Sequence, residues 1–168
     1  AVTDVSDMGS CARMAEGAVR AFGRIDILVN NAALYGGLKG ARFEQLEEAQ
    51  WDAVMTVNVK GLWQCCKAVV EPMRAAGGGS IINISSAGGI VGTVDSSPYN
   101  ASKGGVRLLS KAAAMEFSKL GHDYKIRVNS VHPGVIKTPM TEWIQRGEEG
   151  SDAIVKEQPI GYLGEPED

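Results

Sequence analysis

Short apolar runs alternate with longer stretches of helical periodicity along this chain of 168 residues. Strand-like runs occupy residues 25–29, 80–85 and 125–131. Helix-like stretches occupy residues 7–22, 43–56, 57–74 and 101–120, with a short one at 141–145. Strands that alternate with helices are typical of a parallel α/β sheet, and this length fits one domain. The pattern therefore predicts a single α/β domain over residues 1–168.

The composition narrows the classes of function. The chain is 44% hydrophobic and 22% charged with a net charge of −3, which is ordinary for a soluble globular protein. Without a basic cluster, we expect no nucleic-acid partner, and no apolar run approaches the ~20 residues that cross a bilayer. The three cysteines have neither disulfide nor zinc spacing. We expect a cytoplasmic protein with no metal site and no membrane contact.

Tyr99 and Lys103 are four residues apart and so share one face of a helix. An ammonium group near a phenol lowers the phenol's pKa from its usual ~10, which makes Tyr99 a candidate general acid or base. Ser86 lies thirteen residues before Tyr99, directly after a predicted strand, and can hydrogen-bond a substrate oxygen. Ser85 competes with it on local sequence alone. The set suits proton transfer to or from an alcohol or a carbonyl.

Three further segments occur in order around these residues. Asn30-Asn31-Ala32-Ala33 follows the first predicted strand, Ser85-Ser86 the second and Pro133–Pro139 the third. With Tyr99 and Lys103, these motifs resemble the short-chain dehydrogenase/reductase family over essentially the whole chain. The sequence looks most like the branch of secondary-alcohol and hydroxysteroid dehydrogenases, and the 3-oxoacyl-carrier-protein reductases are close relatives.

The resemblance implies a Rossmann-like, doubly wound parallel sheet with strand order 3-2-1-4-5-6-7. Family members begin with a strand and a glycine-rich turn that binds the cofactor pyrophosphate, and no segment here matches that turn. Residues 2–5 look instead like the end of the family's third strand, and residues 164–168 like the start of a late helix. We therefore expect a middle part of a longer protein, without the N-terminal β-α-β-α unit and the C-terminal strand.

The resemblance also implies hydride transfer between NAD or NADP and a secondary alcohol or ketone. Tyr99 would exchange the proton, Lys103 would lower its pKa and bind the nicotinamide ribose, and Ser86 would polarise the substrate oxygen. Asn58 would hold a water that links Lys103 to solvent. A 3-oxoacyl-carrier-protein reductase remains an alternative, as does a non-catalytic dinucleotide-binding module or an inactive fragment.

Six positions match the family's cofactor contacts in addition to Tyr99 and Lys103. Asp4 and Val5 match the contacts with adenine, and Asn31 and Ala32 match the turn behind the adenosine ribose. Ile136 and Thr138 match the contacts with the nicotinamide carboxamide. Ala33 departs from the glycine that is usual in the family. The residue that distinguishes NAD from NADP in relatives follows the second strand, which is outside this chain.

Residues 139–161 predict a substrate lid, because Met140 and Trp143 lie at helical spacing before a polar, glycine-containing return. With Ser86 and Tyr99, these two side chains would bind a small, largely apolar alcohol or ketone. The helices at 57–74 and 101–120 carry apolar residues on more than one face, which predicts a homodimer or homotetramer. We expect His122 and His132 to be structural or solvated rather than catalytic.

Overall fold

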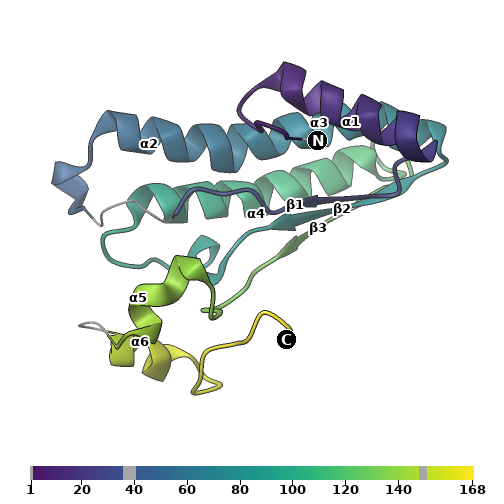
Figure 1. Cartoon of the computed structure of the whole chain (residues 1–168). Helices are drawn as coiled ribbons and strands as arrows, with labels where there is room; N and C mark the ends of the chain where they lie inside the picture. The colour runs from purple at the N-terminus through teal and green to yellow at the C-terminus, as the bar shows by residue number, and fades with distance from the viewer. Residues whose placement is uncertain (1, 36–40, 148–150) are drawn as a thin grey trace.

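Three parallel strands form the centre of the molecule (Figure 1). The computed structural model describes residues 2–35, 41–147 and 151–168, without the side chains of Trp143, Ser151 and Glu157. Strands β1 (Ile27–Asn30), β2 (Gly79–Ile84) and β3 (Ile126–Val131) lie side by side in that order. The register places Leu28 beside Ile81 and Ile81 beside Val128. The predicted parallel α/β class is confirmed.

Helix α1 (Met8–Phe22) begins and ends where its sequence predicts. The Asp7 carboxylate accepts hydrogen bonds from the backbone N–H groups of Gly9 and Ser10, at 3.0 Å each. These are donors that an uncapped helix leaves without partners. At the other end, Gly23 adopts a φ of 79°, a left-handed conformation that glycine takes without steric cost.

The next two predicted helices form one long rod. Helix α2 (Glu48–Met55) passes through a π-helical turn, η2 (Thr56–Gly61), directly into helix α3 (Leu62–Ala75). The predicted start at residue 43 is wrong for the α-helix. A separate 3₁₀ turn, η1 (Phe43–Gln45), comes first, and the extended Leu46, at φ −69° and ψ 124°, interrupts the helical path.

Helix α4 (Ser97–Phe117) begins four residues before the predicted position 101. Pro98 lies in its first turn, where the fixed φ of proline favours helix initiation and its missing N–H is not needed. The early start brings Tyr99 into the helix itself. Short helical elements lie on either side of α4 and β3. They are the 3₁₀ turns η3 (Ala87–Gly89) and η4 (Pro139–Thr141) and the α-helices α5 (Glu142–Gln145) and α6 (Ser151–Glu157). The sequence predicts α5 but not α6.

Helices α3 and α4 cover one face of the sheet, and α1 packs on α3 (Figure 1). The core between these layers is made of apolar side chains, among them Val69, Met73, Ile81, Val106 and Val128. A chain of polar groups crosses it, in which the amide of Asn30 donates to Asn83 and the amide of Asn83 donates to Ser110, both at 2.9 Å. In the described ranges, no helix is long and apolar enough to cross a membrane.

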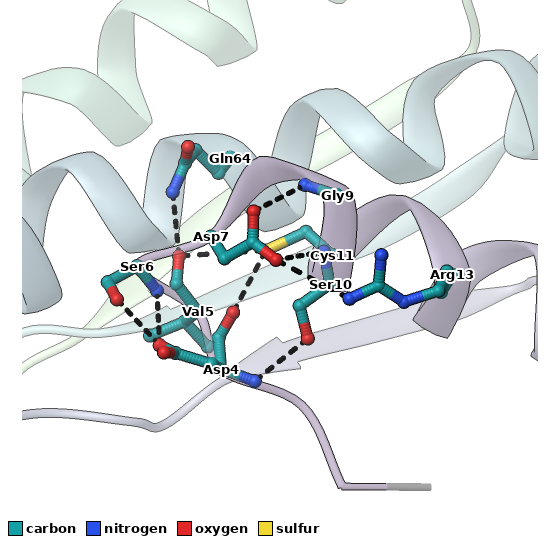
Figure 2. Close-up of polar contacts among 9 residues, drawn as sticks. All are labelled: Asp4, Val5, Ser6, Asp7, Gly9, Ser10, Cys11, Arg13 and Gln64. Carbon is teal, nitrogen blue, oxygen red and sulfur yellow. Dashed lines mark hydrogen bonds and ion pairs between the residues drawn. The ribbon is translucent and has the colours of Figure 1, made fainter.

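Residues 2–5 form no strand, contrary to the sequence-based expectation. A strand requires a neighbouring strand for its backbone hydrogen bonds, and no described strand flanks this segment. Side chains hold it instead (Figure 2). The Gln64 amide donates to the Val5 carbonyl at 2.7 Å, and the Asp4 N–H donates to the Ser10 hydroxyl at 3.0 Å.

Gly61 allows this segment to approach the π-helical turn. A Cβ atom at Gly61 would lie 2.9 Å from Val5 Cγ2 and 3.0 Å from the Val5 carbonyl oxygen, which is closer than real Cβ contacts. At Gly17 in α1, a Cβ atom would meet nothing within 4 Å. The same substitution should therefore have opposite effects at the two helical glycines.

We predict that Gly61→Ala lowers the free energy of unfolding by about 1–3 kcal/mol through overpacking against Val5. Gly17→Ala should raise it by ~0.5–1 kcal/mol, because alanine favours the helix and nothing opposes it. Denaturant titration of both variants of the full-length protein measures this. A stabilising effect at Gly61 would show that the Asp4–Val5 segment does not pack there.

Candidate active site

The candidate site lies at the carboxyl ends of the three strands. In open parallel sheets this edge is where ligands bind, because the loops that follow the strands converge there. Asn31 follows β1, Ser85 and Ser86 follow β2, and His132 follows β3. Helix α4 contributes Tyr99 from its first turn and Lys103 from its second. The motifs that are dispersed in sequence thus meet at one edge.

Tyr99 and Lys103 lie on the same face of α4, as predicted. The Lys103 ammonium lies 5.6 Å from the centroid of the Tyr99 ring. It also donates a hydrogen bond to the Ile84 carbonyl oxygen, at 2.7 Å, which is at the last residue of β2. Only 4% of Lys103 is exposed, so its charge is held inside the protein next to the strand end.

Burial dominates the titration of both groups. It raises the pKa of Tyr99 above its ordinary value, while the contacting Ser86 hydroxyl acts to lower it and Tyr35 to raise it. Burial also lowers the pKa of Lys103 to about 8. The Tyr99 pKa is therefore raised and not lowered as expected, and the contribution of Lys103 to it stays a prediction. Desolvation of the phenolate by burial is the largest cause of this rise.

The structure distinguishes Ser86 from Ser85. The Ser85 side chain is buried, and its hydroxyl donates to the Lys103 carbonyl oxygen at 2.8 Å. The Ser86 hydroxyl is only partly buried and accepts a hydrogen bond from the Gly88 N–H at 3.0 Å. A Cβ atom at Gly88 would lie 3.0 Å from Asn100 Oδ1, 3.5 Å from Ser86 Oγ and 3.7 Å from Tyr99 Cε1, so the Ser86 and Tyr99 side chains both lie beside Gly88. This geometry favours Ser86 as the residue that faces a substrate.

Asn58 fastens the loop after β1 to the long helices. It lies in the π-helical turn, and such turns are frequent at functional sites. Its amide oxygen accepts from the Leu34 N–H at 2.7 Å, and its amide nitrogen donates to the Leu34 carbonyl at 3.1 Å. The same nitrogen donates to Ser102 Oγ at 3.0 Å, and Ser102 donates to the Tyr99 carbonyl at 2.7 Å. The expected water link from Asn58 to Lys103 stays a prediction.

Two neighbours of Tyr99 were not identified from the sequence. Ser102 connects Asn58 to the Tyr99 backbone, and the Tyr35 ring lies 4.5 Å from the Tyr99 ring at 58°. Ser102 lies between Tyr99 and Lys103 in the sequence, but a serine within a helix does not by itself indicate a hydrogen bond to a distant residue. Tyr35 belongs to a loop whose path only the folded chain reveals.

The predicted cofactor residues lie on three segments. Asp4 and Val5 precede α1, and Figure 2 shows the Asp4 carboxylate accepting from the Ser6 N–H and hydroxyl, at 2.9 and 2.7 Å. These Ser6 hydrogen bonds lower the Asp4 pKa. Asn31 and Ala32 are exposed directly after β1.

The remaining cofactor candidates lie in the segment after β3. Ile136 pairs with Gly164 in a parallel bridge, and Thr138 caps the 3₁₀ turn η4. No hydrogen bond within the described ranges joins any of the six candidates to Tyr99. The described residues also contain no cluster of three or more histidine, cysteine, aspartate or glutamate side chains that could hold a metal ion.

The predicted lid consists of η4, α5 and α6, which lie beyond the carboxyl end of β3 and away from the helices on the sheet (Figure 1). Met140 is 39% exposed and Ile144 is buried. The side chain of Trp143 and residues 148–150 lie outside the described part of the chain. The substrate-binding role of Met140 and Trp143 and the closure of this segment stay predictions.

Known proteins resemble this chain over most of its length. A family model described as enoyl-(acyl carrier protein) reductase matches residues 1–168. A 3-alpha-(or 20-beta)-hydroxysteroid dehydrogenase of Mycobacterium bovis is 43% identical over 141 residues, which are 84% of this chain and 52% of the relative. A 3-oxoacyl-(acyl-carrier-protein) reductase of Thermotoga maritima is 38% identical over 167 residues, which are 99% of this chain and 64% of that protein.

Solved structures also resemble this chain. ElxO with NADP bound superposes with a TM-score of 0.86 at 33% identity, over 96% of this chain and 63% of that one. The chain thus spans about half to just under two thirds of the length of these relatives. Because the family model matches the whole chain and these relatives share its sequence and its fold, the chain belongs to the short-chain dehydrogenase/reductase family.

Proposed function

We propose that the protein carrying this chain is an NAD(P)-dependent oxidoreductase that interconverts a secondary alcohol and a ketone. The observation that carries this proposal is the placement of Ser86 Oγ and the Tyr99 ring together beside Gly88, with the buried Lys103 next to the ring. A hydroxyl pair of this kind can hold one substrate oxygen from two sides. An adjacent cation stabilises negative charge on the phenol after it gives up its proton.

Each residue has a distinct task in this proposal. The Ser86 hydroxyl accepts from the Gly88 N–H, which leaves its own hydrogen free to donate to the substrate oxygen. Tyr99 gives a proton to that oxygen during reduction and takes one from it during oxidation. Lys103 stabilises the phenolate that remains after reduction. Asn58 holds α4 and the loop after β1 in register, and we retain the proposal that it also orders a water on the path to Lys103.

The residues present fit a nicotinamide cofactor, which when bound supplies or accepts the hydride. Lys103 has three N–H donors and uses one of them on Ile84, so the buried ammonium has donors left for ribose hydroxyls. We propose that Asp4, Val5, Asn31, Ala32, Ile136 and Thr138 bind the rest of the cofactor. The NADP bound to ElxO supports a nicotinamide dinucleotide as the ligand, and NAD and NADP are both candidates.

The surroundings of the site favour an apolar substrate. Ile90, Val91 and Val94 follow η3 and are 56%, 60% and 89% exposed, and Met140 is exposed in η4. A ring-shaped, largely apolar alcohol such as the relative's hydroxysteroid would cover such side chains. We propose that residues 139–161 close over it as a lid with Met140 and Trp143 in contact with it.

A 3-oxoacyl-carrier-protein reductase is the second candidate, supported by the Thermotoga maritima relative that matches almost the whole chain. A non-catalytic dinucleotide-binding module is the third. Assays of the full-length protein with a hydroxysteroid, cyclic alcohols and a 3-oxoacyl thioester separate the first two. Cofactor binding without turnover of any of them would favour the third.

Tyr99→Phe should reduce turnover by about 10²–10⁴-fold, because the proton donor at the substrate oxygen is lost. Cofactor affinity should stay nearly unchanged. Steady-state kinetics and cofactor titration of the full-length protein measure both quantities. Tyr124→Phe is the matched control, since Tyr124 packs on Phe117 with ring centroids 5.5 Å apart at the opposite end of α4. A Tyr99→Phe variant that keeps a tenth of the wild-type kcat would remove Tyr99 from this role.

The pH dependence of reduction should follow Lys103. The raised pKa of Tyr99 keeps the phenol protonated across neutral pH, whereas the Lys103 pKa of about 8 means that its charge disappears as pH rises through that value. Reduction needs both the phenol and the cation, so kcat/KM for the ketone should fall above pH 8. A profile from pH 6 to 10 measures this. Lys103→Met should be slow throughout and lack the fall, and an unchanged wild-type rate up to pH 10 would contradict the assignment.

The outer surfaces of α3 and α4 support the proposal of a homodimer or homotetramer. On these two helices, Val69 and Val106 are buried in the core. Trp63, Leu108 and Met115, on the same helices, are 44%, 68% and 58% exposed. We predict that the full-length protein scatters light as a dimer or tetramer at micromolar concentration and that Leu108→Glu shifts it toward the monomer. Lys111→Glu, on the same helix, tests whether charge alone causes the shift. A monomeric wild-type mass would refute this interface.

A further inference from the structure

The imidazole ring of His132 lies between the ends of β2 and β3. His132 Nδ1 is 3.1 Å from the Ser86 carbonyl oxygen, and Nε2 is 2.9 Å from Ser130 Oγ. Both ring nitrogens are thus engaged by the protein. This arrangement leaves no free nitrogen for proton exchange with a substrate, but it connects the ring directly to the backbone of Ser86.

The partners determine which ring nitrogen carries the proton. A carbonyl oxygen can only accept, so Nδ1 must bear the hydrogen and donate it to Ser86. In the neutral ring Nε2 then accepts, and the Ser130 hydroxyl is its donor. The Ser86 carbonyl therefore fixes the tautomer, and the Ser130 hydroxyl is compatible with it because a hydroxyl can donate as well as accept.

Backbone hydrogen bonds and the imidazole together hold the peptides around Ser86. The Ser85 N–H donates to the Val131 carbonyl at 2.8 Å, and the Ala87 N–H donates to the Pro133 carbonyl at 2.9 Å. These bonds fix the groups on either side of Ser86. The Ser86 carbonyl oxygen accepts from the Gly89 N–H at 2.9 Å and lies 3.1 Å from His132 Nδ1, so the imidazole adds a side-chain donor to a peptide that the backbone already holds.

We propose that His132 is a positioning residue that acts through Ser86, an inference that rests on the proposed function of Ser86. With the Gly89 N–H, the imidazole holds the Ser86 carbonyl and thereby keeps the Ser86 Cα–Cβ bond directed toward Tyr99. Ser86 Oγ then stays within reach of the Gly88 N–H, and its hydrogen points to the substrate oxygen.

Two substitutions at one position separate the hydrogen bond from the volume of the ring. In the full-length protein with cofactor, His132→Phe keeps a ring but loses the Nδ1–H donor, and we expect kcat to fall about tenfold, the effect of one lost hydrogen bond. His132→Asn places an amide N–H near the position of Nδ1, and we expect it to restore most of that loss. KM for the cofactor should be unchanged in both variants.

A double-mutant cycle tests whether His132 acts through Ser86. In the Ser86→Ala background, His132→Phe should have no further effect on kcat, because there is no hydroxyl left to position. His122→Phe is the control for loss of a histidine, since His122 is exposed and stacks on Tyr124 at 5.3 Å far from Ser86. Its kcat should equal that of the wild type.

Several outcomes would overturn the proposal. They are equal kcat in His132→Phe and the wild type, no recovery in His132→Asn, and the full tenfold loss persisting without the Ser86 hydroxyl. If the wild type turns over no alcohol or ketone, the proposed function fails, and ¹⁵N NMR of the imidazole then decides the role of His132. If His132→Phe does not fold, the same NMR measurement on the wild type decides the role of His132. A ring protonated at Nδ1 supports the bond to Ser86, and one protonated only at Nε2 overturns it.

Discussion

Two reciprocal hydrogen bonds between the end of β2 and the helix α4 hold the site together. The Lys103 side chain donates to the Ile84 backbone carbonyl, and the Ser85 side chain donates to the Lys103 backbone carbonyl. Gly89 makes this closeness possible, since a Cβ atom there would lie 2.7 Å from the Lys103 carbonyl carbon and oxygen. The position of Tyr99, one helical turn before Lys103, is set by this connection.

The same connection has an electrostatic cost. A cationic side chain that is almost wholly removed from water is unfavourable unless hydrogen bonds compensate it, and Lys103 has only part of its hydrogen-bonding capacity satisfied by Ile84. Its lowered pKa expresses this cost. A ligand that brings hydroxyl oxygens to the remaining N–H donors of Lys103 would reduce this electrostatic cost.

Local sequence was sufficient to predict the elements whose ends or faces are marked by particular residues. Asp7 and Gly23 mark the two ends of α1, and the four-residue spacing of Tyr99 and Lys103 does place them on one helical face. Ser85 and Ser86 could not be separated in this way, because both follow a strand. Their difference arises from the alternation of side chains at the strand end, where one points into the core and the next toward the edge.

Other features depend on contacts between distant segments and on burial. The sequence placed Tyr99 next to a cation but could not indicate how deeply both are buried, so the direction of the Tyr99 pKa shift was wrong. Residues 2–5 have the composition of a strand, yet their conformation follows from the neighbours that are available to them. His132 was expected to be structural, and its bond to Ser86 became visible only with the ends of β2 and β3 side by side.

The paired hydrogen bonds of Asn58 have a consequence for sequence variation in the loop after β1. Asn58 binds the N–H and the carbonyl of Leu34, and every residue possesses both groups except proline, which lacks the N–H. The path of the loop past Tyr99 is therefore specified by the backbone of position 34 and not by its side chain. The side chain at position 34 can therefore change while the loop keeps its attachment, and proline is the replacement that would remove one of the two hydrogen bonds.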